Sequence, residues 1–581
     1  MKKIRGSVAW MLVLALLLCG CQTHVASDTT KNHDWMLVGD WTVKGETLKA
    51  PGTKNAAALR SAETLGDSWQ VSVTVDAGKA DCARILLGKD SENIQLAATV
   101  SFDGDKAQLS LCEWKYGKWK DLTVGETFPA DPDQPMVLMA YRYDGSENIR
   151  IALEQNGERL SALKCEEMTA RTLAMLTMAG VGADRVVSFS DFAVGVAVRP
   201  ENPVEVLLKT IQPEDEGFYL ALAEAAMEDM LSNFWQGDTE TGRILPTSHG
   251  YATGTDYTCL WESAMLVFGI YDMWVLTGDE YYKDLLVAEA NYIRENFDPQ
   301  TLETAGGDQN WACEACAWNA MLYLSLYTVT GDQWFVDRTI GLLDDVNARW
   351  YNAELGGMYY RDDVDFMSLY EVGVAVSWLK LWEITGQQRF YDLALRSYEG
   401  MHNRLGRDDG IYYTDASIEA PKGEKERIQE ASSSSFLTGN MGMAALSAKF
   451  YRLTGDQKYL DRVYDINEGL LKYYDKNGVL LNDRDAWTNG VYAAFYASEV
   501  LSLPDTEEVR ALVNNTALSI ATNARTDEGY YGGSWSGPAE GSGSTWYSKG
   551  SIPQQSMTTA TSVLMILAAA IYDTQIEYYA R

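Results

Sequence analysis

A glutamate placed among cysteines and tryptophans is the first candidate for chemistry in this sequence. Glu314 lies in the run Trp311-Ala-Cys-Glu-Ala-Cys-Ala-Trp318, just before an apolar stretch that ends at Thr330-Gly-Asp332. Most single acids in such positions cap helices and face solvent, but the apolar neighbours set Glu314 apart. A carboxylic acid in such surroundings can donate or accept a proton during a reaction, and aromatic faces can hold sugar rings.

The segment around Glu314 belongs to an internal repeat. The same frame, an aromatic or acidic opening, an apolar stretch and a Thr-Gly stop, recurs around Trp261–Asp279, Leu369–Gln387 and Thr438–Asp456. Such repetition predicts an architecture built from one unit, here a helical hairpin. Glycine after the apolar stretch suits a helix C-cap, and the following aspartate suits the N-cap of the next helix.

The number of predicted helices favours a closed ring. Adding Phe218–Phe234 before the repeats and Gln554–Tyr572 after them gives about twelve helices. We therefore predict an all-α (α/α)6 toroid of six hairpins over residues 218–575, closed by packing of the last helix on the first. The more apolar helix of each hairpin, such as Met321–Val329, lines the inside. A glycine with a short extended run, such as Gly357-Met-Tyr-Tyr, marks the return to the next inner helix.

All inner helices of such a ring begin at the same end, so the residues before them meet at one mouth. The carboxylates predicted to be catalytic there are Glu314, Glu262, Glu371 and Asp485. The predicted substrate-binding residues are Trp261, Asp308, Trp311, Trp318, Tyr370, Trp487, Trp535 and Trp546. Carboxylates beside aromatic platforms suit glycoside hydrolysis, in which one acid protonates the leaving oxygen and another attacks or activates water.

The region before the helices has the pattern of a β-sandwich. Over residues 34–198 the apolar residues alternate with period two, most clearly in Trp69–Val75, and Asp103-Gly104 and Asn156-Gly157 mark turns. The region is similar to sandwiches of the concanavalin-A/laminin-G type. Residues 199–217, which contain Pro200, Pro203 and Pro213, are predicted to be a linker.

The N-terminus has the outline of an export signal. Lys2, Lys3 and Arg5 precede the apolar run Val8–Leu18, and Leu18-Cys19-Gly20-Cys21 resembles the end of a bacterial lipoprotein signal. We expect residues 1–21 to be this signal, Cys21 to carry the lipid, and residues 22–33 to be a tether. The protein would then be lipid-anchored in a bacterial cell envelope, facing the cell surface or the periplasm.

The net charge and the spacing of the cysteines limit the kinds of partner and bound group that the chain could have. A net charge of −34 argues against nucleic acid and fits a neutral polysaccharide or oligosaccharide. Cys313 and Cys316 form a single CxxC without the further ligands of a zinc site, so buried thiols are favoured and no metal is expected. No glycine-rich phosphate loop follows a strand, and we expect no cofactor and a monomeric chain.

Several of these segments resemble one enzyme family. Cys316-Ala-Trp318 leading to Thr330-Gly-Asp332, Phe450–Leu460, Asn489–Phe495 and Trp535-Ser-Gly-Pro538 occur in the order typical of glycoside hydrolase family 76. The resemblance covers roughly residues 217–572. It implies an (α/α)6 fold and the endo-α-1,6-mannanase activity of that bacterial and fungal family.

One departure from the family pattern affects the expected chemistry. The family has two adjacent aspartates, nucleophile and acid/base, four and three residues before the tryptophan that corresponds to Trp318. Here those positions hold Glu314 and Ala315. The resemblance implies that Glu314 is one catalytic carboxylate and that its partner comes from another hairpin, with Glu262, Glu371, Asp308 and Asp485 as candidates. The alternatives are a glycan-binding lipoprotein without hydrolysis and a divergent hydrolase that acts on another linkage.

Overall fold

The computed structural model describes residues 35–574 with gaps. The longer gaps are 50–56, 89–94, 143–148, 166–172, 179–186, 198–201, 245–259, 297–311, 418–436, 482–488 and 539–551, and shorter gaps of one to three residues occur elsewhere. The predicted signal peptide, Cys21 and the tether lie outside the described residues. The chain divides into two units, the first ending at Pro200 and the second beginning at Glu201. A strand-rich first part and a helix-rich second part are confirmed.

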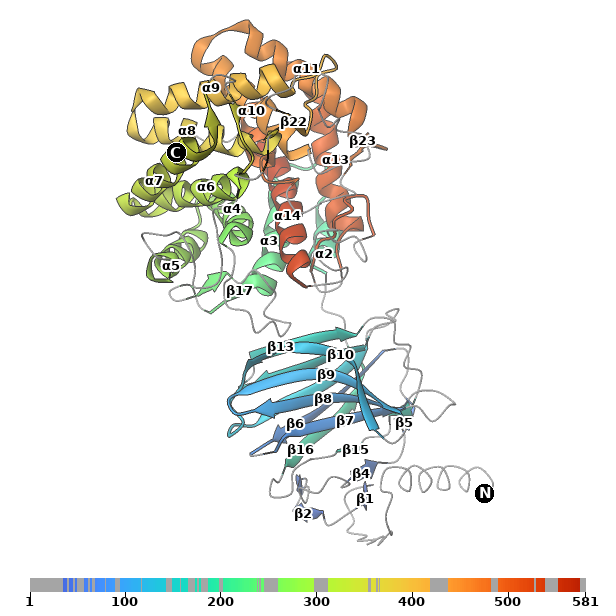
Figure 1. Ribbon diagram of the computed structural model, residues 1–581. Coiled ribbons are helices and arrows are strands. Elements are labelled where there is room, and N and C mark those ends of the chain that lie inside the picture. Colours follow the sequence, from blue (N-terminus) through green and yellow to red (C-terminus); the bar gives the residue numbers. More distant parts are fainter. Residues whose placement is uncertain are drawn as a thin grey trace. The chain divides into compact units, whose positions relative to one another are not determined.

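Two antiparallel sheets make up most of the first unit (Figure 1). The seven-stranded sheet has the order β13 (Glu158–Cys165), β12 (Ile149–Gln155), β11 (Met136–Arg142), β6 (Trp69–Asp76), β16 (Ser188–Gly195), β3 (Thr47–Lys49) and β2 (Thr42–Lys44). The six-stranded sheet has the order β10 (Lys118–Pro129), β9 (Lys106–Lys115), β8 (Gln95–Asp103), β7 (Cys82–Gly88), β14 (Leu173–Ala174) and β5 (Glu63–Thr64). A three-stranded sheet contains β1 (Trp35–Val38), β4 (Ala57–Arg60) and β15 (Thr177–Met178).

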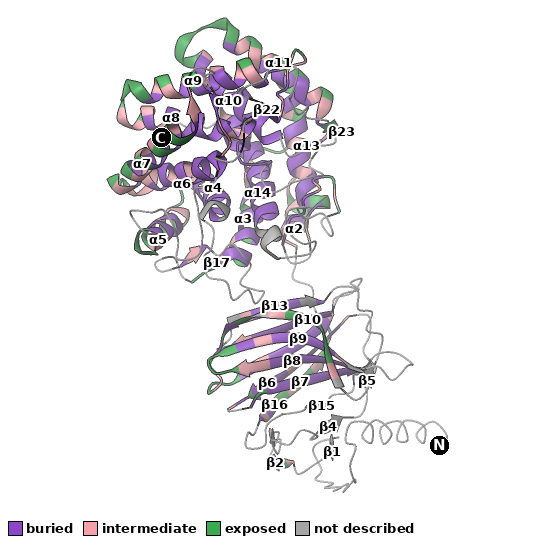
Figure 2. Cartoon of the chain, in the orientation of Figure 1, coloured by how far each residue is buried: buried purple, intermediate pink, exposed green. Residues whose placement is uncertain are grey.

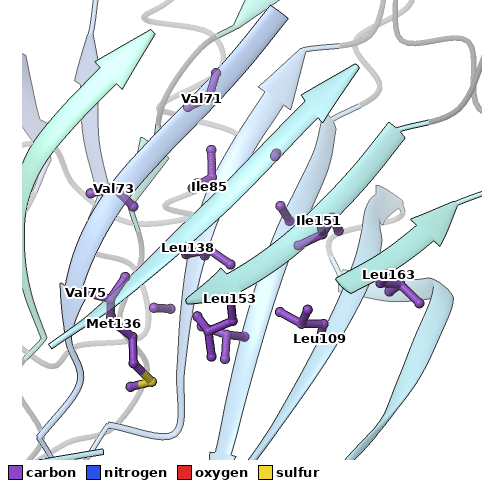
Figure 3. Close-up of a cluster of buried hydrophobic side chains, with 14 of the residues drawn as sticks. Val71, Val73, Val75, Ile85, Leu109, Met136, Leu138, Ile151, Leu153 and Leu163 are labelled. Carbon is purple, nitrogen blue, oxygen red and sulfur yellow. The ribbon is translucent and has the colours of Figure 1, made fainter. Parts of the chain in front are cut away.

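The two large sheets share one hydrophobic core, and the period-two pattern explains which residues enter it. In β6 every second residue from Trp69 to Val75 is buried, as the alternation predicted. These side chains belong to the same buried cluster as Ile85 of β7 and Leu109 of β9 (Figure 3). Each fully buried valine or isoleucine contributes about 1.5–3 kcal/mol through the hydrophobic effect.

The second unit is built from helices of alternating character. They are α2 (Pro203–Thr210), α3 (Phe218–Phe234), α4 (Leu260–Thr277), α5 (Glu280–Asn296), α6 (Cys313–Thr330), α7 (Gln333–Trp350), α8 (Val372–Thr385), α9 (Gln388–Leu405), α10 (Leu437–Thr454), α11 (Gln457–Tyr473), α12 (Ala493–Glu499), α13 (Glu507–Asn523) and α14 (Ile552–Thr574), with the 3-10 turn η1 (Leu369–Glu371) before α8. Helices α6, α10 and α14 are largely buried, whereas α7, α9 and α11 each have an exposed face (Figure 2).

A helix lies inside the range that the sequence predicted as a linker. Asn202 caps α2 by accepting hydrogen bonds from the backbone N–H groups of Val204 and Glu205, and Pro203 occupies the first helical position. Proline there loses no intrahelical hydrogen bond and has the backbone angle that a helix requires. The segment therefore belongs to the helical unit.

The Thr-Gly stops work as the sequence predicted. Gly331 ends α6 with a φ of 68°, in the left-handed region that glycine adopts without a steric penalty. Thr330 donates to the carbonyl of Leu326 over 2.8 Å, and Asp332 accepts a 3.0 Å hydrogen bond from the N–H of Trp334 at the start of α7. Glycine has the same left-handed conformation at the ends of α4, α8 and α10.

The buried helices follow one another in a closed order. Helix α4 packs on α6, α6 on α8, α8 on α10, α10 on α12, α12 on α14, and α14 again on α4. Helix α14 also packs extensively on α3, as predicted for the last and first helices, and the two lie side by side in Figure 1. The window Met557–Thr574 of α14 is long and apolar enough to span a membrane, but 83% of it is buried inside the protein, as in a core helix.

Short antiparallel pairs lead from the exposed helices back to the buried ones. They are β17 (Trp235–Gln236) with β18 (Arg243–Ile244), β19 (Tyr351–Asn352) with β20 (Gly357–Met358), β21 (Phe366–Ser368) with β22 (Asp415–Ser417), and β23 (Asp475–Lys476) with β24 (Val479–Leu480). Single bridges join Gly406 to Tyr412 and Arg525 to Tyr531. Most of these pairs contain the glycine-led extended runs seen in the sequence, and they bring distant segments to the ends of the buried helices.

Candidate active site

Glu314 lies at the beginning of α6 in a buried position. Its side chain is 3% exposed, and the hydroxyl group of Tyr360 donates a hydrogen bond to its carboxyl group. The backbone holds the two segments together, because the N–H of Cys313 donates to the carbonyl of Tyr360 over 3.0 Å. Oε2 of Glu314 accepts no hydrogen bond from the part of the chain that the structure describes. A buried carboxyl oxygen without a donor disfavours the ionised form.

The protonation of Glu314 follows from these surroundings. Burial, opposed in part by the Tyr360 hydrogen bond and assisted by the charge of the nearby Asp415, raises the pKa of Glu314 to about 8. The side chain is therefore protonated at neutral pH, like other acids that donate a proton from an apolar site. This property favours an acid over a nucleophile among the roles considered from the sequence.

Asp415 is the second carboxylate that the fold brings near Glu314, and it is not among the site residues predicted from the sequence. It starts β22, where it pairs with Ser368 of β21, and it is 7% exposed. The N–H of Leu369, the first residue of η1, donates to the carbonyl of Thr414 over 2.9 Å. This pairing joins the entrance of α8 to the segment after α9. The available signal in the sequence was the position of Asp415 two residues after the extended run Gly410-Ile-Tyr-Tyr.

Aromatic side chains line the region next to Glu314. The ring of Tyr370 lies edge-on to that of Trp318 at 6.5 Å and is tilted against that of Tyr360 at 6.2 Å. Tyr370 is partly exposed, and its sugar-contacting role stays a prediction. Trp318 is only 1% exposed and forms a hydrogen bond with the hydroxyl group of Tyr492. Trp318 therefore packs inside the protein against Tyr370, and its predicted role as a sugar-binding platform is corrected.

Glu371 is held inside the protein by its own partners. It is fully buried, its Oε1 accepts a hydrogen bond from the hydroxyl of Ser397, and its Oε2 accepts one from the N–H of Met358 at 3.3 Å. Burial raises the pKa of Glu371 to about 8, against the lowering effect of these hydrogen bonds and of Arg396. Both oxygens are occupied in joining η1 to α9 and β20, which argues against the predicted catalytic role.

Trp535 is also a structural residue. Its side chain is fully buried, and its Nε1 donates to Ser562 of α14 over 3.0 Å. The prediction that Trp535 leans over the mouth is therefore wrong. The local sequence, rich in glycine and serine, indicated an exposed loop, but the indole packs against the last helix.

The remaining predicted residues are described only in part. Trp261 and Glu262 lie in the first turn of α4, but their side chains are outside the description, so their predicted roles stay predictions. Five others, Asp308, Trp311, Asp485, Trp487 and Trp546, lie outside the described residues altogether. Cys313 and Cys316 are buried and form no disulfide. Burial raises the pKa of Cys313 well above its usual value, so Cys313 packs as an apolar group.

Comparison with known proteins assigns the helical part of the chain to a family. The sequence model described as Glycosyl hydrolase family 76 matches residues 219–577. The chain belongs to glycosyl hydrolase family 76. This family assignment makes the chain a glycoside hydrolase by class, and it covers the helical unit with Glu314, Tyr370 and Asp415.

Solved structures of family 76 proteins are similar to the chain. An inactive variant of the α-1,6-mannanase of Salegentibacter sp. HEL1_6, in complex with α-1,6-mannotriose, is 18% identical with a TM-score of 0.48, covering 61% of this chain and 99% of its own. A family 76 glycoside hydrolase from a bovine Bacteroides thetaiotaomicron strain is 14% identical with a TM-score of 0.48, covering 92% of this chain and 99% of its own. The comparison with curated proteins gave no significant match.

Position 315, where the family pattern has a second aspartate, is occupied by alanine in this chain. Ala315 is 1% exposed and follows Glu314 within the first turn of α6. A methyl group can neither ionise nor donate a proton, so position 315 cannot supply the second catalytic group. Of the described acids, Asp415 is the one whose charge acts directly on Glu314.

Proposed function

We propose that the helical unit is a six-hairpin (α/α)6 toroid whose mouth hydrolyses α-1,6-mannan or a related α-linked glycan. The observation that carries this proposal is the buried Glu314, protonated at neutral pH and electrostatically coupled to Asp415, beside the partly exposed Tyr370. Membership in family 76 supports the reaction class, and the names of similar solved structures support the substrate.

The two carboxyl groups take different roles in this proposal. Glu314 gives its proton to the glycosidic oxygen as the bond from that oxygen to the anomeric carbon breaks. In the same step Asp415 either bonds to the anomeric carbon or removes a proton from the water that attacks this carbon. In the first case a water molecule, which gives a proton to Glu314, then displaces Asp415 from the glycosyl-enzyme and completes the hydrolysis. The proposed site therefore contains two acids although position 315 is alanine, because Asp415 of β22 provides the second one. Tyr360 orients the Glu314 carboxyl, and Tyr370 offers a face to a sugar ring.

A second candidate function is glycan binding without hydrolysis, and Ala315 is the observation that favours it. The two functions are distinguished by their products, because only a hydrolase releases oligosaccharides from the glycan. A panel of polysaccharides that includes α-1,6-mannan should be incubated with the full chain, and new reducing ends and released oligosaccharides measured. We expect products from α-1,6-mannan with the natural chain and about 10²–10⁴ times less product with Glu314→Gln at equal folded content. Binding of α-1,6-mannan in calorimetry without any product would establish the non-catalytic function instead.

The N-terminal region completes the proposal. We infer that the chain is exported, acylated at Cys21 and tethered to a bacterial membrane as a monomer, with a concanavalin-A/laminin-G-like sandwich between the tether and the toroid. The lipoprotein-like signal and the strand-rich first unit support this arrangement. Replacement of Cys21 by alanine should move the protein from the membrane fraction to the soluble fraction. Continued sedimentation with membranes would contradict lipid anchoring.

A further inference from the structure

A groove on the outside of the helical unit has the composition of a carbohydrate-binding surface. It has a volume of about 730 Å³ and is lined by residues of α2, the exposed side of α3 and the first turn of α5. This volume lies within the range of roughly 300–1,000 Å³ that is usual for small-molecule sites. The residues around Glu314 do not contribute to it, so the groove is separate from the candidate active site.

The groove presents aromatic side chains on a rigid support. Tyr281 is 45% exposed, and among the exposed large hydrophobic residues of the described chain it is the aromatic one. Tyr282 lies edge-on to it, with ring centres 5.3 Å apart, and the partly exposed Trp235 lines the groove at the end of α3. Asp279 accepts a 2.9 Å hydrogen bond from the N–H of Tyr281 and so fixes this helix start. Such platforms cost little entropy on binding.

Two carboxylates lie one helical turn apart on the α3 side of the groove. Glu224 and Glu228 are exposed, and both act electrostatically on Tyr282. The described residues that line the groove include no lysine or arginine. An anionic ligand would be repelled by this surface. Carboxylate oxygens beside aromatic faces instead suit a ligand that donates many hydroxyl hydrogen bonds and has apolar C–H faces, which is the chemistry of a neutral sugar.

We propose that this groove is a second glycan-binding site, which holds a neutral stretch of polysaccharide without cleaving it. The choice of a polysaccharide rests on the proposed function. Apolar helices of other proteins fit less well, because Glu224 and Glu228 would lose water without gaining a partner. A second copy of this chain would bring another strongly acidic surface to the groove. A site outside the cleft raises the avidity for long chains, because one polymer can occupy both places.

Binding can be tested in a background that does not cleave the ligand. The full chain with Glu314→Gln is run in gels that contain α-1,6-mannan, dextran or polygalacturonate. Adding Tyr281→Ala should weaken the apparent affinity for a retarding neutral polysaccharide about tenfold, whereas Tyr281→Phe, which keeps the ring, should stay within about twofold. Leu453→Ala removes another exposed apolar side chain, 40% exposed and outside the groove, and should also change little.

Several results would overturn the inference. In the gels, these results are equal retardation of Tyr281→Ala and its Glu314→Gln parent, no retardation of the parent by either neutral polysaccharide, or stronger retardation of the parent by polygalacturonate than by the neutral polysaccharides. In light scattering, a parent that is a dimer and a Tyr281→Ala variant that is a monomer would show that the groove binds a second copy of the chain. The outcome is separable from the proposed function. If the natural chain releases no product from any glycan but Tyr281→Ala still weakens binding, the hydrolase proposal fails and the second site stands.

Discussion

At the scale of single residues, the proposal depends on the proton of Glu314. Burial raises the pKa of Glu314 to about 8, so the acid form dominates below that pH and is lost above it. Since only the acid form can protonate a leaving oxygen, kcat/KM for α-1,6-mannan should fall as the pH rises through about 8. A pH profile of the initial rates measures this limb. A constant kcat/KM up to pH 9.5 would contradict a donor role for Glu314.

Tyr360 provides a sharper test of the same residue. Its hydroxyl donates to the Glu314 carboxyl and lowers the pKa of that group. Tyr360→Phe removes the donor, so the alkaline limb of the pH profile should move to higher pH. Tyr451→Phe, near the end of α10, is the matched control and should leave the limb in place. A limb that moves to lower pH in Tyr360→Phe would show that the hydrogen bond does not stabilise the ionised form.

The site could be predicted from the sequence only in part. The buried position of Glu314 could be predicted because the apolar residues next to it in the sequence also lie next to it in the first turns of α6. The position of Asp415 could not, because its approach depends on the pairing of β22 with β21, which joins segments far apart in the sequence. The exposure of Trp318 and Trp535 does not follow from the local composition. Trp318 packs against Tyr370 and Tyr492, and Trp535 packs against α14, so tertiary contacts decide which aromatic rings reach solvent.

At the scale of helices and turns, the prediction was most successful where the chemistry is local. The Thr-Gly-Asp stops were predicted because a left-handed glycine and an aspartate cap act within a few residues. Helix α2 is absent from the prediction although Asn202-Pro203 is a helix start signal, because three prolines in one segment are also typical of a linker. The short strand pairs were seen as extended runs, but their partners follow from the tertiary fold.

The glycine at a helix end can be compared with a glycine inside a helix. Gly331 has a φ of 68°, so Gly331→Ala should lower the free energy of unfolding by about 1–2 kcal/mol. Gly341 lies in the interior of α7 with open space around its Cβ position, so Gly341→Ala should raise it by about 0.4–1 kcal/mol. Urea unfolding followed by circular dichroism at 222 nm measures both. Equal shifts in the same direction would contradict the assigned backbone conformations.

At the scale of the whole helical unit, closure joins the first helix to a segment about 300 residues later. Arg525 donates to both carboxylate oxygens of Asp229, over 2.7 and 2.6 Å, and Tyr531 donates to the same group over 2.9 Å. The side chains of Arg525 and Asp229 are 7% and 8% exposed. The repeat in the sequence predicted that the ends meet, but not this ion pair, because neither residue belongs to the repeated frame.

Loss of this buried pair should be costly. Arg525→Met leaves the Asp229 carboxylate buried without its cation, and we expect a loss of about 3–5 kcal/mol in the free energy of unfolding. Arg294→Met removes an exposed pair with Asp332, with side chains 48% and 29% exposed, and should cost at most about 1 kcal/mol. The midpoint of urea unfolding of the helical signal reports both values. Similar costs for the two variants would show that Arg525 does not hold the ring closed.

The different roles of Glu314 and Asp415 are tested most directly by comparing two substrates, one whose leaving group needs a proton and one whose leaving group does not. The kcat/KM of the Glu314→Gln and Asp415→Asn chains should be measured on α-1,6-mannan and on a dinitrophenyl glycoside of α-1,6-mannobiose, whose phenolate leaves without a proton. We expect Glu314→Gln to lose a factor of about 10²–10⁴ on mannan and little on the dinitrophenyl substrate, and Asp415→Asn to lose activity on both. Equal losses of Glu314→Gln on the two substrates, or a fully active Asp415→Asn, would contradict the proposed pair.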